Sequence, residues 1–188
     1  QKNSILYYES DTNTNLLFLV SGLVKIFKSD KFENEIFLYH IYKNSMISEL
    51  SSIKQNDIYC FSNAEFIEDS VILSIDFKKF QELFLFKNIL TMELMEILLE
   101  KTHLLQCIVN RELVFDATAK VAYMLNQDIE IFNKLKRQEV SFMLHIQPET
   151  LSRVLKKLSR NGIIEIHNGE INIKDKISLK YIFKGVRI

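Results

Sequence analysis

The sequence is poor in proline, glycine and cysteine. Its 188 residues include one Pro, four Gly, two Cys and no Trp. The two cysteines, Cys60 and Cys107, are too few for a disulfide framework and lack C-x-x-C spacing, which favours a reducing compartment. No apolar run reaches the ~18 residues that a membrane span needs, and no signal peptide is visible. We therefore expect a cytoplasmic protein without a membrane partner.

Arginine is missing from more than half of the chain. Residues 1–110 contain ten Lys, no Arg and fifteen Asp or Glu, which gives a net charge of −5. Residues 111–188 contain fourteen Lys or Arg and nine Asp or Glu, which gives +5. Such a split is typical of a protein in which one part meets a polyanion. Chance variation of surface charge explains the count equally well, so both interpretations stay open.

Short runs of β-branched and aromatic residues fill the region from Leu16 to Asp76. The runs are "LLFLVSG", "LVKIFKS", "EIFLYHIY", "IYCFSNAEF" and "SVILSID". This spacing predicts an antiparallel β-barrel or sandwich, with Gly22 at a turn between the first two strands. Asp76 then has the position of an N-cap for the short helix "FKKFQELF".

A longer amphipathic helix is predicted over residues 87–110. Its apolar stripe is too long to be covered by one small barrel. A helix that joins two domains can use such a stripe to pair with its twin, although Leu and Met at this spacing are most often core residues. The residues that we expect at a dimer contact are Met95, Leu98, Leu99, Leu105 and Ile108.

The C-terminal part reads as helices at residues 116–125 and 131–135, followed by helix, turn, helix and hairpin. The only proline, Pro148, suits the first turn of the second helix of that motif, where its missing N–H costs nothing. Gly162 is placed to end the helix. Asn168-Gly169 is the strongest short hairpin pattern, since both residues of that turn need positive φ. This order is that of a winged helix-turn-helix.

The helix that begins at Pro148 has two faces. Leu151, Val154, Leu155 and Leu158 form a stripe that we expect to be buried. The exposed face would read bases, because Arg donates two hydrogen bonds to guanine and Glu accepts one from cytosine. Glu149 and Arg153 are also spaced to pair with each other on a solvated face. The predicted base-reading residues are Glu149, Ser152 and Arg153, and the predicted phosphate contacts are Lys136, Arg137, Lys156, Lys157 and Arg160.

The run "KRQEVSFMLHIQPETLSRVLKKLSRNGIIEIHNGEINI" resembles the Crp–Fnr family of bacterial transcription regulators, and "LFLVSGLVKIF" and "ISEL" resemble parts of its sensor domain. The resemblance implies an α+β fold in three parts. They are a β-barrel sensor of the cyclic-nucleotide-binding type (1–86), a dimerisation helix (87–110) and a winged helix-turn-helix (111–188). The family barrel begins further upstream, so we expect the first part to be N-terminally incomplete.

The resemblance also implies a homodimer that binds an inverted repeat in double-stranded DNA. Glu149, Ser152 and Arg153 are similar to the set with which family members read TTGA-type half-sites. RNA polymerase is an expected partner if the protein is an activator. Two residues depart from the family pattern. His145 stands where the turn normally has Gly, and Pro148 stands where cyclic-AMP receptors carry another base-reading Arg.

The effector cannot be chosen from the sequence. In the family, an Arg-Ser pair holds the cyclic phosphate. Counting forward from Glu49, the matching positions here are Tyr59 and Cys60, or Ile58 and Tyr59 if the alignment has a one-residue gap. A tyrosine donates a hydrogen bond but supplies no charge. We therefore expect a degenerate pocket at Glu49, Tyr59 and Cys60, with Glu49 as a surface-loop residue. Cyclic AMP is then not the effector.

Other sensors and other functions remain as alternatives. An iron–sulfur sensor needs four thiolates, whereas a haem-based or redox-based sensor of gas or nitrosative stress needs an axial ligand. The candidate haem ligands are His40, His103, Cys60 and Cys107. A small-ligand barrel module without a DNA role leaves the hairpin and the positive half unexplained. A metal-dependent barrel enzyme needs clustered His ligands, so we predict neither an enzyme nor a metal site.

Overall fold

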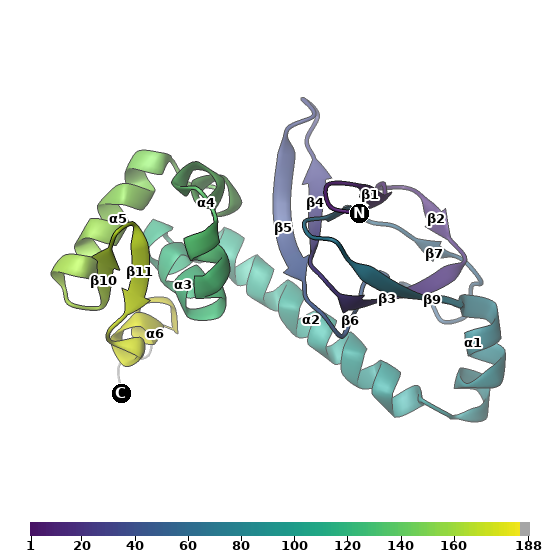
Figure 1. Cartoon of the computed structure of the whole chain (residues 1–188). Coiled ribbons are helices and arrows are strands. Elements are labelled where there is room, and N and C mark those ends of the chain that lie inside the picture. The colour runs from purple at the N-terminus through teal and green to yellow at the C-terminus, as the bar shows by residue number, and fades with distance from the viewer. Residues whose placement is uncertain (185–188) are drawn as a thin grey trace. The chain divides into compact units, whose positions relative to one another are not determined.

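The computed structural model describes residues 1–184, which fall into two compact units (Figure 1). The first unit is Gln1–Gln106, and the second begins at Cys107. The division falls within the long helix α2 (Thr91–Leu113). None of the helices in residues 1–184 combines the length and hydropathy that a transmembrane segment requires. The last four residues of the predicted DNA-binding part lie outside the described residues.

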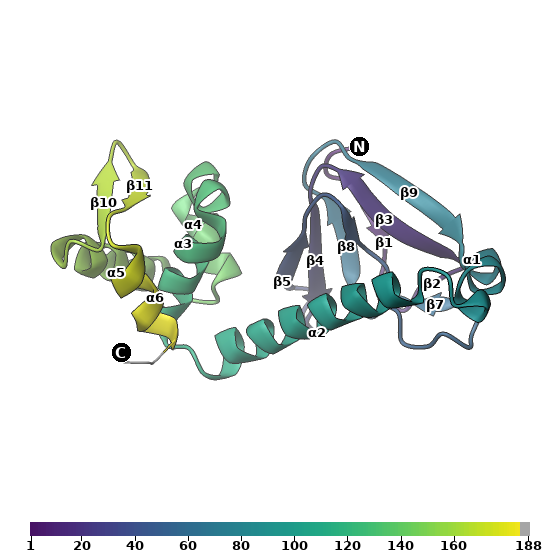
Figure 2. The same cartoon turned by 90° about the horizontal axis from the view of Figure 1, so that it is seen from below.

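The first unit is built from antiparallel strands in three ladders, of order β1-β8-β4-β5, β6-β3-β9 and β2-β7 (Figure 2). The antiparallel β fold predicted for this part is thus confirmed. The three ladders stay separate within the described residues. The strands are β1 (Ile5–Tyr7), β2 (Thr12–Asn13), β3 (Asn15–Ser21), β4 (Val24–Ser29), β5 (Glu35–Ile41), β6 (Ser45–Met46), β7 (Ile58–Tyr59), β8 (Asn63–Phe66) and β9 (Val71–Asp76).

The turn between β3 and β4 requires its glycine. Gly22 has φ +98°, and a Cβ added there would collide with the backbone and side chain of Ser70. The alternating residues that follow in β4, Val24 and Ile26, are fully buried in the core of the unit. The predicted turn therefore sets the register that turns these side chains inward.

One predicted strand, residues 58–66, is interrupted in the structure. The Glu49 carboxylate accepts hydrogen bonds from the Phe61 N–H and the Ser62 hydroxyl, both at 2.8 Å. Because of these bonds, the backbone between the end of β7 and the start of β8 is not part of any strand ladder. Glu49 lies in the loop between β6 and β7, as predicted, but it is half-buried there and its carboxylate accepts two hydrogen bonds.

Helices close the first unit. α1 (Phe77–Leu83) begins at the predicted N-cap, where the Asp76 carboxylate accepts from the Lys79 N–H at 2.8 Å. A 3₁₀ turn, η1 (Leu85–Lys87), follows. The long helix begins later than expected, since Asn88 and Leu90 adopt left-handed φ angles of +57° and +58° that a right-handed helix excludes.

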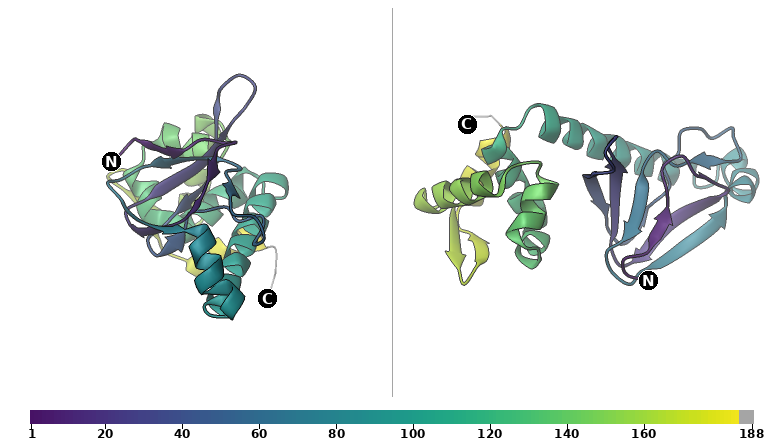
Figure 3. Two further views of the ribbon diagram at one scale, coloured as in Figure 1. Left: turned by 90° about the vertical axis from the view of Figure 1, so that its right-hand side faces the viewer. Right: turned by 90° about the horizontal axis from the view of Figure 1, so that it is seen from above.

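The second unit packs its helices and a hairpin around one core (Figure 3). The span α3 consists of two helical stretches that meet at a kink at Asp128, where φ is −137° and ψ is 48°, in agreement with the two predicted helices. The C-terminal helix α6 escaped prediction. The elements are α3 (Ala117–Lys134), α4 (Arg137–Met143), α5 (Pro148–Arg160), β10 (Ile164–His167), β11 (Glu170–Ile173) and α6 (Lys176–Lys184).

Candidate nucleic-acid interface

Helices α4 and α5 form a helix-turn-helix with the predicted bounds. The Glu139 carboxylate accepts from the Lys136 N–H at 2.6 Å and so caps α4. His145 lies in the turn with φ +52°, the left-handed conformation expected for the position where Gly is usual. Pro148 is the first residue of α5. Local residues therefore determine both the helix ends and the turn.

Helix α5 is sharply two-faced. Leu151, Val154, Leu155 and Leu158 are 0–7% exposed and belong to the core of the second unit. The opposite face is exposed and carries Glu149, Ser152, Arg153, Lys156, Lys157 and Arg160. Within residues 1–184, no ion pair joins Glu149 to Arg153. Both side chains are thus available to a ligand, and the alternative of a mutual pair has no support.

The β10–β11 hairpin is the predicted wing. Asn168 and Gly169 have φ angles of +50° and +87°, as its two-residue turn requires. Four residue pairs, from Ile164↔Ile173 to His167↔Glu170, hold it together. The Asn133 side chain bonds both the N–H and the carbonyl of Ile171, each at 3.0 Å.

Arg137 is placed differently from the other predicted phosphate contacts. One terminal nitrogen donates to the Gly169 carbonyl at 2.6 Å, and the guanidinium lies 4.9 Å from the ring centroid of Phe132. Its other terminal nitrogen is buried and has no partner among the described residues. Burial lowers the pKa of this guanidinium. Arg137 therefore fastens the wing tip to the start of α4.

A partly buried ionic cluster holds the turn between α4 and α5, and nothing in the sequence pattern indicated it. The Glu112 carboxylate accepts from Arg111 Nε at 2.6 Å and Lys120 Nζ at 3.1 Å, and lies 2.9 Å from His145 Nδ1. Lys120 Nζ also donates to the Leu144 carbonyl at 3.2 Å. Burial opposes the charge of Glu112, but hydrogen bonds from His145, Arg111 and Lys120 outweigh it and lower its pKa to about 2.

The residues predicted for the effector pocket do not line one cavity. The Tyr59 hydroxyl bonds to Ser10 Oγ at 3.0 Å, and its ring packs against Phe61 at 4.8 Å. Cys60 is buried, and burial together with the charges of Glu49 and Asp11 raises its pKa to about 11. Glu49 holds the loop after β7. These three side chains are thus engaged with the protein itself.

The four candidate haem ligands are dispersed. His40 is partly buried against Phe37, with ring centroids 4.9 Å apart, and burial with the charge of Lys25 lowers its pKa to about 4. His103 is exposed, and Cys107 is half-buried. In residues 1–184, no group of three or more His, Cys, Asp or Glu is arranged to hold a metal ion.

The predicted dimer residues divide between two faces of α2. Met95, Leu99 and Leu105 are 49%, 63% and 55% exposed. Leu98 instead packs on the core of the first unit, and Ile108 is half-buried. Three further apolar residues of the helix are exposed, and a search for steps of three and four residues would have found them: Met92, Val109 and Leu113.

Two family sequence models match the chain. The cyclic nucleotide-binding domain matches residues 1–85, and the Crp-like helix-turn-helix domain matches residues 111–182. A search of curated proteins finds no match.

Several solved structures have a similar fold. A mutant of CooA from Carboxydothermus hydrogenoformans is 21% identical, with a TM-score of 0.76 over 97% of this chain and 85% of that one. FixK2 from Bradyrhizobium japonicum is 17% identical, with a TM-score of 0.71 over 97% and 93%. CprK in complex with OCPA is 19% identical, with a TM-score of 0.68 over 96% and 86%. At these identities the likeness concerns the fold.

Three observations indicate the same family: the sequence run around α4 and α5, the geometry of the wing, and the two matching domain models. The chain combines a β domain of the cyclic-nucleotide-binding type with a DNA-binding helix-turn-helix, and it belongs to the Crp–Fnr family of transcription regulators.

Proposed function

We propose that the protein binds DNA as a homodimer, at an inverted repeat with TTGA-like half-sites, and that cyclic AMP does not control it. The observation that carries this proposal is the exposed face of α5. Glu149, Ser152 and Arg153 lie on it without partners in the described structure, opposite a stripe of four buried aliphatic residues.

The N-terminal half of α5 supplies the chemistry for base recognition. Arg153 donates two parallel hydrogen bonds to guanine O6 and N7, and Glu149 accepts one from cytosine N4. Ser152 lies between them on the same face and donates or accepts. These donors and acceptors suit the T·A, G·C and A·T pairs of a TTGA half-site better than a uniform basic surface does.

Cationic side chains around the base-reading face position the helix on the DNA backbone. They carry no sequence information, because every phosphate is alike. Arg137 is held by the wing and contributes chiefly by fixing its tip. The free cations that we assign to phosphates are Lys136, Lys156, Lys157 and Arg160, all of them exposed.

Helix α2 supports the homodimer. Met92, Met95, Leu99, Val109 and Leu113 are exposed at positions that fit a and d of a heptad repeat, the repeat of a two-stranded coiled coil, and Leu105 lies beside this row. Leu99 and Leu113 are 63% and 81% exposed and belong to this row, and a continuous row of exposed apolar side chains favours contact with a partner. Two copies of the protein would then present two α5 helices to half-sites about 34 Å apart.

The β unit supports the exclusion of cyclic AMP. A buried phosphate needs a cation or several donors. Residues 1–110 contain no Arg, and the positions that match the family's Arg-Ser pair hold Tyr59 and Cys60. Tyr59 already bonds Ser10, and Glu49 already accepts from two donors.

The test is a titration of fluorescent duplexes followed by anisotropy at fixed salt. An inverted repeat of two TTGA-like halves one helical turn apart is compared with a scrambled duplex and with a single half-site. We expect binding to the repeat at least ~10³-fold tighter than to the scrambled duplex. Equal affinity for the repeat and the scrambled duplex would refute sequence recognition. Equal affinity for the repeat and the single half-site would refute the dimeric arrangement.

A further inference from the structure

Helix α6 carries a row of positive charge that the proposed DNA contacts do not include. Lys176, Lys180 and Lys184 recur at intervals of four residues, so they lie on one face of the helix, and all three are exposed. Lys174, just before the helix, is paired with Glu165 at 2.6 Å, whereas none of these three forms an ion pair within residues 1–184. We call the three residues the lysine row.

The lysine row does not stabilise α6 as a helix. Lys176 is the first residue, where the positive end of the helix dipole disfavours a cation. Like charges four residues apart on a helix repel each other, so Lys180 is disfavoured by both of its neighbours in the row. The preceding carboxylate, Asp175, accepts from two backbone N–H groups of the first turn, each at 3.0 Å. The charge of the row is thus not compensated within the described residues, which favours an external anion.

The opposite face of α6 fixes the direction of the row. Leu179 is fully buried, and Ile182 and Phe183 pack on the core of the second unit. The Phe183 ring lies against Tyr123 of α3, with ring centroids 5.4 Å apart. The buried face holds the helix on the unit, so the lysine row is in place before any ligand binds.

Helix α6 begins close to the end of α5. The Ile163 carbonyl, three residues after α5, accepts from the N–H groups of Lys174 and Asp175 at 2.9 and 3.1 Å. These bonds connect the segment after Arg160 to the start of the row. Figure 2 shows α6 at the base of the β10–β11 hairpin, at the opposite end from its tip. The row thus continues the basic surface of α5 away from the base-reading residues.

The spacing of the row suits the backbone of a nucleic acid. An α-helix rises ~1.5 Å per residue, so the row places a cation every ~6 Å over ~12 Å. Each strand of duplex DNA carries a phosphate per ~3.4 Å of axis, so the row spans about four successive phosphates. A membrane surface fits less well, because Ile177 is the one large apolar side chain among residues 176–184 that is exposed.

We propose that Lys176, Lys180 and Lys184 bind phosphates of duplex DNA outside the base pairs that α5 reads. Each ammonium donates to phosphate oxygens, and the contacts add affinity without sequence information. The inference rests on the proposed function, because α5 on its half-site defines where the flanking DNA lies. The protein should therefore bind a repeat with flanking DNA more tightly than the same repeat at the ends of a duplex.

Anisotropy titrations of the whole protein with two duplexes test the row. One duplex ends at the inverted repeat, and the other continues for ~10 base pairs, one helical turn, on each side. The wild type should bind the long duplex about tenfold more tightly at low salt. The triple variant Lys176→Gln, Lys180→Gln, Lys184→Gln should lose this advantage and bind the short duplex as the wild type does. On the long duplex, the slope of log affinity against log salt should fall by up to ~2.7 per protomer, at ~0.9 for each phosphate.

A matched control removes the same charge from the first unit. Lys78, Lys79 and Lys87 are exposed on α1 and η1, and replacing all three with Gln should leave the binding of both duplexes unchanged. Circular dichroism checks that the α6 variant is folded. If it is not, ethylation of single phosphates is measured with the wild type, and ethylation beside the repeat must weaken binding.

Three results would overturn the inference: an α6 variant that keeps the advantage of the long duplex, an equal loss for both duplexes, or the same loss in the control. The first would assign the lysine row to a different anion, such as an acidic protein surface. Flanking phosphates whose ethylation leaves binding unchanged would also overturn it.

Failure of the proposed function is a separate result, because the wild type would then bind the repeat and a scrambled duplex of the same length equally. The salt slope on the scrambled duplex still tests the lysine row in that case. A slope reduced in the α6 variant and not in the control supports phosphate contacts of the row, and an unchanged slope in the α6 variant rejects them.

Discussion

Two lysines of the β unit are paired with carboxylates, whereas the cations on the exposed face of α5 in the second unit are not. In the β unit, Lys25 lies between Glu35 and Glu65 at 2.8 and 2.7 Å, and Lys28 pairs with Glu9 at 2.6 Å. On α5, by contrast, the cations of the exposed face have no ion-pair partner in the described structure. The sign of the net charge thus says less than the state of each cation. A paired lysine is neutralised within the protein, while an unpaired one on an exposed helix is available to a polyanion.

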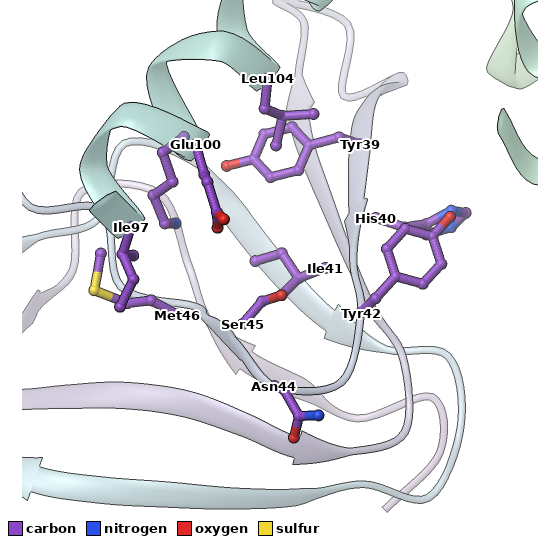
Figure 4. A pocket seen from close by; sticks show the side chains of 11 residues that line it. Tyr39, His40, Ile41, Tyr42, Asn44, Ser45, Met46, Ile97, Glu100 and Leu104 are labelled. Atoms are coloured by element: carbon purple, nitrogen blue, oxygen red, sulfur yellow. The ribbon is translucent and has the colours of Figure 1, made fainter. Parts of the chain in front are cut away.

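The units also differ in how their sites are assembled. The DNA-reading face of α5 comes from one continuous helix, so a spacing of three and four residues is enough to define it. A pocket of the β unit is lined by residues 39–46 of β5, β6 and the turn between them and by residues 97–104 of α2, which lie more than fifty residues apart in the chain (Figure 4). Contact across such distances in sequence leaves no periodic pattern.

The largest expected effect comes from charging the exposed face of α2. Replacing both Leu99 and Leu105 with Glu should produce monomers, because four carboxylates would meet at the dimer contact. The loss of simultaneous binding to two half-sites should weaken operator binding by ~10²–10⁴-fold. Sedimentation and anisotropy measure the two effects. Replacing the half-buried Leu98 instead would disturb the core, so it is unsuitable as the control, and Glu96→Lys serves better. A double variant that still sediments as a dimer would disprove this contact.

The next effect concerns base reading. Arg153→Ala should cost about 1–3 kcal/mol per half-site and relax the preference at one guanine. Arg153→Lys keeps the charge but loses the two-pronged geometry, so it should lose specificity while nearly retaining affinity for scrambled DNA. Anisotropy with a set of single-base operator variants measures both. If a variant loses the same factor of affinity for the operator and for scrambled DNA, Arg153 contacts only phosphate.

A third prediction addresses the ionic cluster that holds the turn. Glu112→Gln should lower the free energy of unfolding of the second unit by about 1–3 kcal/mol near neutral pH, since Arg111, Lys120 and His145 lose a charged acceptor. Urea unfolding followed by circular dichroism measures the change. Glu170→Gln makes the same chemical change at an exposed position of the wing and should have little effect.

The cluster also predicts a pH dependence with a definite sign. The folded-state pKa of Glu112 is about 2, below the ordinary value of 4.5. Its contribution to stability is therefore complete above about pH 4.5 and is lost as the pH falls toward 2. Wild-type protein should lose more stability than Glu112→Gln across this window. Parallel curves for the two proteins would show that Glu112 is not the titrating group.

Smaller effects should distinguish free from paired lysines. Lys157→Ala should weaken binding to all duplexes similarly and reduce the slope of log affinity against log salt by ~0.9 per protomer. Lys28→Ala removes the same charge from the β unit, where Glu9 already neutralises it, and should leave the slope unchanged. Salt titrations of both variants provide the measurement. An equal change of slope in the two variants would mean that net charge alone governs the interaction.

The smallest expected effect is that of cyclic nucleotides. Cyclic AMP and cyclic GMP should give no saturable heat and no change in DNA affinity, because the β unit offers their phosphate no arginine. Calorimetry and anisotropy check this expectation. Micromolar binding together with tighter operator binding would show that the donors around Tyr59 and Cys60 rearrange to receive the phosphate.

Predictions from the sequence succeeded where a residue acts on its near neighbours. Asp76 caps α1, His145 adopts the left-handed turn, Pro148 opens α5, and Asn168-Gly169 forms the wing turn. Each depends on a backbone preference or a hydrogen bond within a few residues. The spacing of apolar residues predicted the long helix, but the predicted start at residue 87 is too early. Leu90 has a left-handed φ, which is unusual for leucine and could not be anticipated.

Predictions were incomplete where a side chain acts at a distance. A continuous strand over residues 58–66 was expected, and Glu49 divides it. Arg137 is a residue type that commonly contacts phosphate, yet one of its N–H groups donates to the Gly169 carbonyl. The stripe on α2 was read as one surface, although Leu98 packs on the β unit and Leu99 is exposed.

The sequence by itself determined the order of elements, the faces of α5, the turn and the wing. Helical and strand periods, together with Pro, Gly and Asn at positions of restricted φ, carry that information locally. Only the tertiary structure decided that Glu112, Lys120 and His145 meet behind the turn, and that Lys101 and Tyr39 face one pocket. Packing of segments that are distant in the sequence brings these groups together, and burial strengthens the interactions between them. No local sequence pattern encodes which groups meet.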